Sequence, residues 1–132
     1  MSLLVDFKDM QDARARLHTA IRHTPIVPLA RNATETGAEK LYIKCENLQV
    51  TGAYKVRAAF TMLDRLSAAQ KAKGVVLASS GNFAQGFAYA GRLMGIPIAV
   101  VMLNETSPYK LDATRDHGAE VVFCDDALAR QL

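Results

Sequence analysis

The sequence predicts an α/β protein with a parallel sheet between helices, a three-layer αβα sandwich. Three apolar runs, at 75–78, 98–102 and 121–124, lack the alternation of a half-exposed strand, and each follows a glycine closely. The segments between these runs have apolar residues at the spacing of a helix. Such runs are typical of parallel strands covered on both faces. Because crossovers are right-handed, the loops that follow these strands are expected along one edge, where α/β proteins bind ligands.

The N-terminal part is expected to begin with an amphipathic helix. Between residues 7 and 21 apolar residues recur at spacings of three and four, and Asp6 precedes them as a cap. The helix must stop before Thr24 and Pro25, because proline cannot continue a helix and biases the residue before it toward an extended conformation.

Two further elements are expected before the second half of the chain. A short helix over 28–36 is predicted to end at Gly37, a natural left-handed cap, and a strand is predicted over 41–45. Helical spacing then resumes over 56–73 and stops at Gly74, which predicts one helix.

The apolar runs in the second half alternate with predicted helices. One helix is expected over 82–94, ending at Gly95, and another over 108–117, ending at Gly118. A third begins after the last strand, and the chain stops within it, at 127–132.

Composition and charge narrow the classes of function. The chain has 132 residues, half of them hydrophobic, and a net charge of +3 spread without aromatic interleaving, so no nucleic-acid surface is predicted. No apolar run reaches the length of a membrane span. Cys45 and Cys124 lie in apolar runs, and neither they nor His18 and His23 have metal-ligand spacing. A cytoplasmic protein with reduced thiols and no metal site is expected.

A polar turn containing Gly52 leads from the strand at 41–45 to Lys55, which opens the next helix. The positive helix end and the neighbouring Arg57 disfavour a second cation here, and carbonyl chemistry requires a free amine. Position alone is a weak signal, since most lysines at helix starts are solvated surface residues.

The surrounding segment, 44–60, carries a longer pattern. It resembles the K-x-E-N-x-Q-x-T-G-S-F-K-x-R-G-A signature of pyridoxal-phosphate (PLP) enzymes of fold type II, the tryptophan synthase β-subunit type. The threonine/serine dehydratase and serine racemase group is the most similar, and it also has a Thr-Pro at the position of Thr24. The residues in register are Lys44, Glu46, Asn47, Gln49, Thr51, Gly52, Lys55, Arg57 and Ala59. The resemblance implies that Lys55 is the Schiff-base lysine, with Tyr54 as the aromatic residue before it.

A second loop, 79–86, joins the first apolar run to its helix. Its small residues and the free N–H groups of a helix start suit an anion, although a plain Ser/Asn helix cap explains the bare pattern too. The loop resembles S-S/A-G-N-H-A-Q-G/A of the same enzymes. That resemblance implies that the substrate carboxylate and the cofactor's phenolic oxygen are held here. The carboxylate contacts that the resemblance implies are Ser79, Ser80, Gly81 and Asn82, with Asn82 also contacting the cofactor.

Three positions bear on the reaction and the substrate. Ser80 aligns with the serine that acts as acid/base opposite the lysine in the racemase branch. Phe83 stands where histidine is usual, which removes a polar group from beside the carboxylate loop and bears on substrate preference. Ala53 stands where serine is usual and has no hydroxyl to offer.

The resemblance implies a PLP-dependent threonine/serine dehydratase, an ammonia-lyase that converts a β-hydroxy amino acid to a 2-oxo acid and ammonia. The expected partners are the amino-acid substrate and, at full length, further copies of the protein. Two alternatives stay open. One is a racemase, of serine or aspartate type, or another β-eliminating or β-replacing enzyme, and the other is a non-catalytic α/β binding module.

Enzymes of this family are more than twice as long, and their phosphate-gripping glycine-rich loop has no counterpart in this sequence. The expected division places 1–55, with the lysine loop, in the large PLP domain and 56–132 in a small α/β domain with the carboxylate loop. We therefore expect an N-terminal fragment that is inactive alone and binds PLP poorly.

Overall fold

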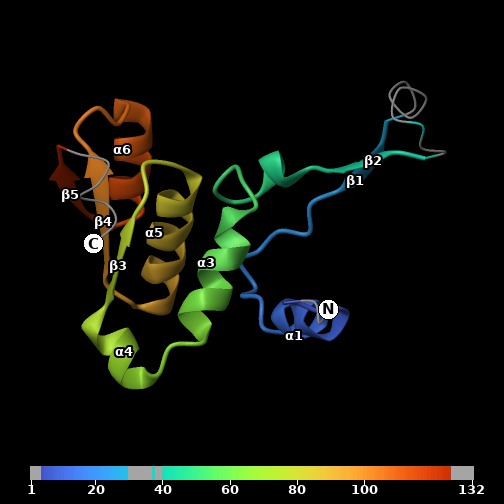
Figure 1. Cartoon of the computed structure of the whole chain (residues 1–132), viewed down its shortest axis with the longest axis horizontal. Helices are drawn as coiled ribbons and strands as arrows, with labels where there is room; N and C mark the ends of the chain where they lie inside the picture. The colour runs from blue at the N-terminus through green and yellow to red at the C-terminus, as the bar shows by residue number, and fades with distance from the viewer. Residues whose placement is uncertain (1–3, 30–36, 38–39, 126–132) are drawn as a thin grey trace.

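The computed structural model describes residues 4–29, 37 and 40–125. Its centre is a parallel sheet of strands β3 (Val75–Ala78), β4 (Ile98–Leu103) and β5 (Glu120–Cys124), in the order β3-β4-β5 (Figure 1). Residues 75–78 pair with 98–101, and 99–103 pair with 120–124. The expected α/β class with a parallel sheet is confirmed, and each predicted strand is present.

Helices α5 (Asn82–Met94) and α6 (Pro108–Asp116) connect these strands and pack against each other. Because both right-handed crossovers run in the same direction along the sheet, both helices fall on one face. The burial of the strands agrees with helices on one face only. Residues of β4 alternate between buried and half-buried, and Val76 of β3 is 73% exposed. The described residues therefore form two of the three expected layers, the sheet and one layer of helices.

Helix α3 (Lys55–Asp64) packs across α5 and completes the core. Apolar residues of α3, α5 and β4 meet there, and Phe60 is only 2% exposed. The two helices approach closely at Gly86, where a Cβ atom would lie 3.1 Å from the backbone nitrogen of Val56. Glycine is needed at this position because any side chain would push α3 away from α5.

The single helix predicted over 56–73 is wrong, since two helices occupy this range. Helix α3 ends at Asp64, and α4 (Ala68–Lys73) begins afresh after Ser67. Ser67 Oγ accepts a hydrogen bond from the Gln70 N–H (3.3 Å), and Gln70 Oε1 accepts one from the Ser67 N–H (2.9 Å). This capping box starts a new helix and turns the chain toward β3.

Helix α1 (Phe7–Ala15) begins as predicted, because Asp6 caps it in a reciprocal pair with Asp9. It ends at Ala15, however, so the prediction of a helix to Ile21 is wrong. No residue of α1 is buried, and Phe7 is 72% exposed. A short helix gains most of its stability from packing, and this one has little apolar surface to pack against.

Strand β1 (Ile26–Pro28) pairs antiparallel with β2 (Tyr42–Lys44), the strand predicted at 41–45. Strand β1 was not predicted, and Pro28 lies in it instead of starting a helix. The rest of that predicted helix, 30–36, lies outside the described residues, as does the helix predicted at 127–132. Gly37 has the expected left-handed backbone, with φ of 69°.

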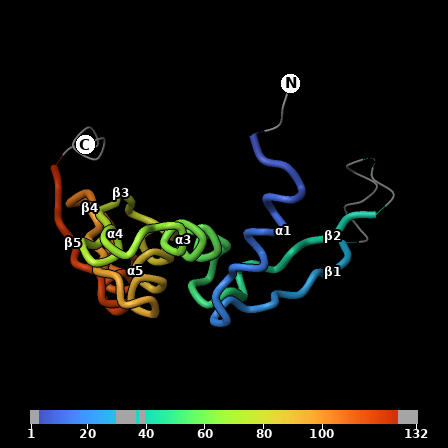
Figure 2. Tube along the Cα trace, turned by 90° about the horizontal axis from the view of Figure 1, so that it is seen from below, coloured from blue at the N-terminus to red at the C-terminus, as the bar shows by residue number. Residues whose placement is uncertain are grey.

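The two halves of the molecule are separated by α3. Figures 1 and 2 both place α1 and the β1–β2 ribbon on the opposite side of α3 from the sheet. The strand-to-helix loop that precedes α5 thus lies on the sheet side of α3. Among the described residues, no helix has the length and apolar character needed to cross a membrane.

Candidate active site

Lys55 is the first residue of α3 and lies beside the start of α5. Its Nζ is 4.8 Å from the ring centroid of Tyr54 and 6.0 Å from that of Phe83, the second residue of α5. The backbones meet one turn later, where a Cβ on Gly86 would lie 3.3 Å from the carbonyl carbon of Lys55. The lysine loop and the 79–86 loop, far apart in the sequence, therefore lie side by side.

The start of α5 has the properties of an anion-binding helix end. Gly81 is its N-cap, with extended backbone angles, and no side chain caps the helix. The Ser79 hydroxyl accepts a hydrogen bond from the Gly81 N–H (3.4 Å), so it does not cap the first turn of α5. Asn82 is exposed, and a Cβ on Gly81 would meet no atom within 4 Å. No side chain therefore occupies the positive end of α5, where helix N–H groups commonly bind anions.

Ser80 faces the neighbouring loop, after β4. Its Oγ accepts hydrogen bonds from the Thr106 hydroxyl (3.0 Å) and from the Leu103 N–H (3.4 Å). A polar cavity of about 330 Å³ lies there, lined by Ser80, Leu103, Glu105, Thr106, Ser107 and Lys110. Of the four residues predicted to bind the carboxylate, Ser80 is thus the one held by the β4–α6 loop.

Glu46 and Arg57, two charged residues of the lysine signature, bind each other. Glu46 opens the short 3-10 helix η1 (Glu46–Leu48) and accepts two hydrogen bonds from Arg57, 2.9 Å from Nε and 2.8 Å from the terminal nitrogen. The Thr24 hydroxyl donates to the same carboxylate. The bonds from Arg57 lower the pKa of Glu46 from 4.5 to about 2, against the raising effect of burial.

Gln49 and Lys44, two further signature residues, hold the segment from Arg22 to Thr24. Gln49, 3% exposed, accepts from the Arg22 N–H (2.9 Å) and donates to the Arg22 carbonyl (3.0 Å). Arg57 donates to the same carbonyl (3.2 Å), and Lys44 Nζ donates to the carbonyl of Thr24. Much of the lysine signature therefore binds the segment from Arg22 to Thr24.

These bonds correct one expectation about Lys55. Arg57 was expected to act as a cationic neighbour of the lysine, but its guanidinium is paired with Glu46 and directed toward Arg22. The sequence reasoning also missed the structural role of Glu46, Gln49 and Thr24. The matching Thr-Pro and the Glu-Arg pair were visible in the sequence, but their contact depends on the tertiary fold.

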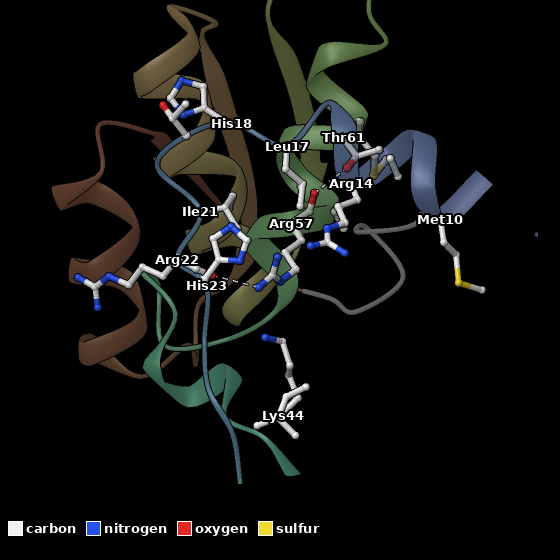
Figure 3. Close-up of a pocket in the computed structure, with 15 residues that line it drawn as sticks. Met10, Arg14, Leu17, His18, Ile21, Arg22, His23, Lys44, Arg57 and Thr61 are labelled. Atoms are coloured by element: carbon white, nitrogen blue, oxygen red, sulfur yellow. Dashed lines mark hydrogen bonds between the residues drawn. The ribbon is translucent and has the colours of Figure 1, made fainter. Parts of the chain in front are cut away.

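A larger groove, of about 1050 Å³, lies between α1 and α3 (Figure 3). Its walls combine apolar side chains with arginines, among them Leu17, Ile21, Arg14 and Arg57. Neither Lys55 nor the 79–86 loop lines it, so size alone does not identify the site. The candidate site is placed at Lys55 because its amine and the uncapped start of α5 lie side by side there.

The histidines have structural surroundings. His18 stacks on Phe60 with the ring centroids 4.8 Å apart, and His117 meets Tyr89 edge-on at 5.3 Å. Burial lowers the pKa of His117, and Arg92 adds to this effect. In the part of the chain that the structure describes, no three His, Cys, Asp or Glu residues come together as a metal site.

Residues 17–132 match the family described as pyridoxal-phosphate dependent enzymes, and the chain belongs to this family. The match covers both the lysine loop and the loop before α5. It confirms the family expected from the two motifs.

Among curated relatives, the chain is 45% identical to L-threo-3-hydroxyaspartate ammonia-lyase of Pseudomonas sp. over 92% of its length and 38% of the relative's. It is 43% identical to L-threonine ammonia-lyase of Geobacter sulfurreducens over 86% of its length and 28% of the relative's. Its fold is similar to that of maize serine racemase, with a TM-score of 0.87 and 30% identity over 98% of this chain and 39% of that one. The chain thus spans well under half the length of these relatives.

Proposed function

We propose that this chain forms the part of a PLP-dependent ammonia-lyase that binds the cofactor through Lys55 and the substrate carboxylate through residues 79–82. The substrate class is a β-hydroxy amino acid, which the enzyme converts to a 2-oxo acid and ammonia. One observation carries the proposal: the Lys55 amine and the uncapped start of α5 lie side by side. An uncapped helix start suits the carboxylate of an amino-acid substrate, and the amine beside it suits the aldehyde of the cofactor.

The residues present suit part of the cofactor. Lys55 supplies the amine for the aldehyde, Tyr54 lies beside that amine, and the exposed Asn82 is available for the phenolic oxygen. When bound, PLP supplies the electron-accepting ring that makes the α-proton of an amino acid removable. The phosphate group has no comparable partner among the described residues of this site.

The chain's own groups would carry two tasks in this reaction. Lys55 Nζ, as a free amine, would act as the general base that takes the α-proton of the bound amino acid. The N–H groups that begin α5 hold the substrate carboxylate, which turns the Cα–H bond toward the lysine. Both tasks require the two helix starts to stay at a fixed separation, which the α3–α5 contact at Gly86 provides.

The relatives support the substrate class. Two of them are named as ammonia-lyases, acting on L-threo-3-hydroxyaspartate and on L-threonine, and both substrates carry a hydroxyl group on Cβ. For the complete protein we further propose a cytoplasmic homo-oligomer. We also propose that 1–55 belongs to a large PLP domain and 56–132 to a small one.

Racemisation is the second candidate, and one observation favours it. Ser80 aligns with a racemase acid/base, and the chain is similar in fold to maize serine racemase. Assaying the complete protein for D-amino acid and for 2-oxo acid separates the two reactions. A non-catalytic binding module is disfavoured, since no carboxylate of the described residues forms an ion pair with Lys55.

Cofactor attachment tests the proposal on the 132-residue chain itself. The chain is mixed with PLP and reduced with borohydride, and the modified lysine is located by peptide mass spectrometry. We expect weak binding with attachment concentrated at Lys55 and lost in Lys55→Arg. Lys44→Arg is the matched control, because Lys44 belongs to the same motif but binds the Thr24 carbonyl. Attachment spread evenly over exposed lysines would contradict the proposal.

A further inference from the structure

We propose that the Glu46–Arg57 pair is a positioning pair, which fixes the first turn of α3 against the segment from Arg22 to Thr24 and so directs Lys55 toward the start of α5. This inference rests on the proposed function, because that function requires the Lys55 amine to lie beside the start of α5. Neither residue contacts the site itself. Their effect reaches Lys55 through the backbone of the first turn of α3.

The geometry of a helix explains the coupling. Arg57 follows Lys55 by two residues, which is about 200° around the helix, so the two side chains leave α3 on nearly opposite sides. Figure 3 shows Arg57 extended toward Arg22, in the groove that Lys55 does not line. Any rotation that moved Arg57 out of contact with Glu46 would swing Lys55 away from Phe83 by the same angle.

The apolar core already fixes the side of α3 that faces α5, because Val56, the second residue of the helix, has no exposed surface. The first turn has few polar anchors besides the Glu46–Arg57 pair. Its N-cap, Tyr54, makes no side-chain capping bond. At Gly86 the approach of this turn to α5 is between backbones, since glycine has no side chain to interlock with α3. The Arg57 fork binds both carboxylate oxygens of Glu46, and bidentate pairs of this kind fix orientation as well as distance.

The carboxylate is itself held in place. The Thr24 hydroxyl donates a hydrogen bond to the Glu46 carboxylate, and Thr24 is only 6% exposed. Arg57 also reaches the Arg22 carbonyl, which Gln49 binds as well. The pair is therefore anchored to a segment outside α3, as a positioning device requires.

The test compares Glu46→Gln with the control Asp12→Asn, which breaks an exposed ion pair in α1. One readout is the rate of PLP attachment at Lys55, trapped and mapped as above. The other readout needs no cofactor. The lysines are reductively methylated with ¹³C, and the NMR signal of Lys55 is assigned as the one that is lost in Lys55→Arg. Its chemical shift reports how close the lysine lies to the rings of Tyr54 and Phe83.

In Glu46→Gln we expect attachment at Lys55 to slow about tenfold, since misplacing a reacting group is costly. The Lys55 signal should move toward that of an ordinary exposed lysine. Asp12→Asn should change neither. Arg57→Lys keeps the charge but loses the bidentate contact, so its attachment rate and its Lys55 signal should lie between those of the wild type and Glu46→Gln. If Glu46→Gln does not fold, Arg57→Lys is compared with the wild type instead.

The two proposals fail in different ways. If the wild type takes up no PLP at Lys55 but the methyl signal still moves in Glu46→Gln, the function is wrong and the positioning role stands. If the folded variants keep both the attachment rate and the signal of the wild type, the pair is only structural and the positioning role is overturned.

Discussion

The two sides of α3 are held together by different forces. On the sheet side, α3, α5 and β4 share an apolar core in which Val56, Val100 and Met102 have no exposed surface. On the other side, α1, β1 and β2 contain no buried residue. Polar bonds join the 22–25 segment there to the lysine signature, and Ile21 just before that segment reaches the apolar core. The candidate site thus lies at the start of a helix, α3, that the apolar core holds on one side and polar bonds hold on the other.

The largest expected effect is on the core. Phe60→Ala should lower the free energy of unfolding by about 3–5 kcal/mol, because it removes a buried ring and leaves a cavity. Phe7→Ala, in the exposed helix α1, should change it by less than about 0.5 kcal/mol. Urea denaturation followed by circular dichroism measures both. Equal losses from the two substitutions would mean that α1 has an apolar core of its own.

The α3–α5 contact should be the next most sensitive. Gly86→Ala places a Cβ 3.1 Å from the Val56 nitrogen and 3.3 Å from the Lys55 carbonyl carbon, and backbone atoms cannot move aside as a side chain does. We expect a loss of about 1–3 kcal/mol in the same assay.

Gly81→Ala is the matched control for Gly86→Ala. Its Cβ meets nothing within 4 Å and its φ is −148°, so the change should be within about 0.5 kcal/mol. If both variants were equally stable, the close approach of the two helices would be dispensable.

The polar side should respond to acid. Glu46 has a pKa of about 2 in the folded chain against 4.5 as its reference value, so its contribution is complete above about pH 4.5 and is lost as the pH falls toward 2. Between pH 6 and pH 3 the wild type should lose about 1–2 kcal/mol that Glu46→Gln does not lose.

Asp12→Asn gives the smallest effect and serves as the reference for Glu46. Its partner Lys8 is exposed, and such pairs contribute at most about 0.5 kcal/mol. Unfolding curves recorded at both pH values test the difference. An acid-dependent loss as large in Glu46→Gln as in the wild type would show that the Glu46–Arg57 pair adds no stability.

Apolar periodicity and the positions of glycine were enough to predict most of the architecture of the C-terminal half of the chain. Continuous apolar runs predicted β3, β4 and β5. Helix α5 stops at Gly95 as expected, and α6 stops at Asp116, just before Gly118. Both glycines have positive φ. The break between α3 and α4 was missed, because the capping box at Ser67 and Gln70 interrupts an apolar pattern that continues through it. Strand β1 was missed because three residues carry no periodic signal of their own.

The candidate site was predictable only as two separate motifs. The amino-acid sequence determined that Lys55 opens one helix and Asn82 another. Helix starts depend on local signals, such as turn glycines and the ends of strands, which come from neighbouring residues. Only the tertiary structure decided that these helix starts meet at Gly86, that Arg57 turns away to Glu46, and that Ser80 is held by Thr106. Those contacts join residues distant in the chain, and their energies exist only once the core has brought the segments together.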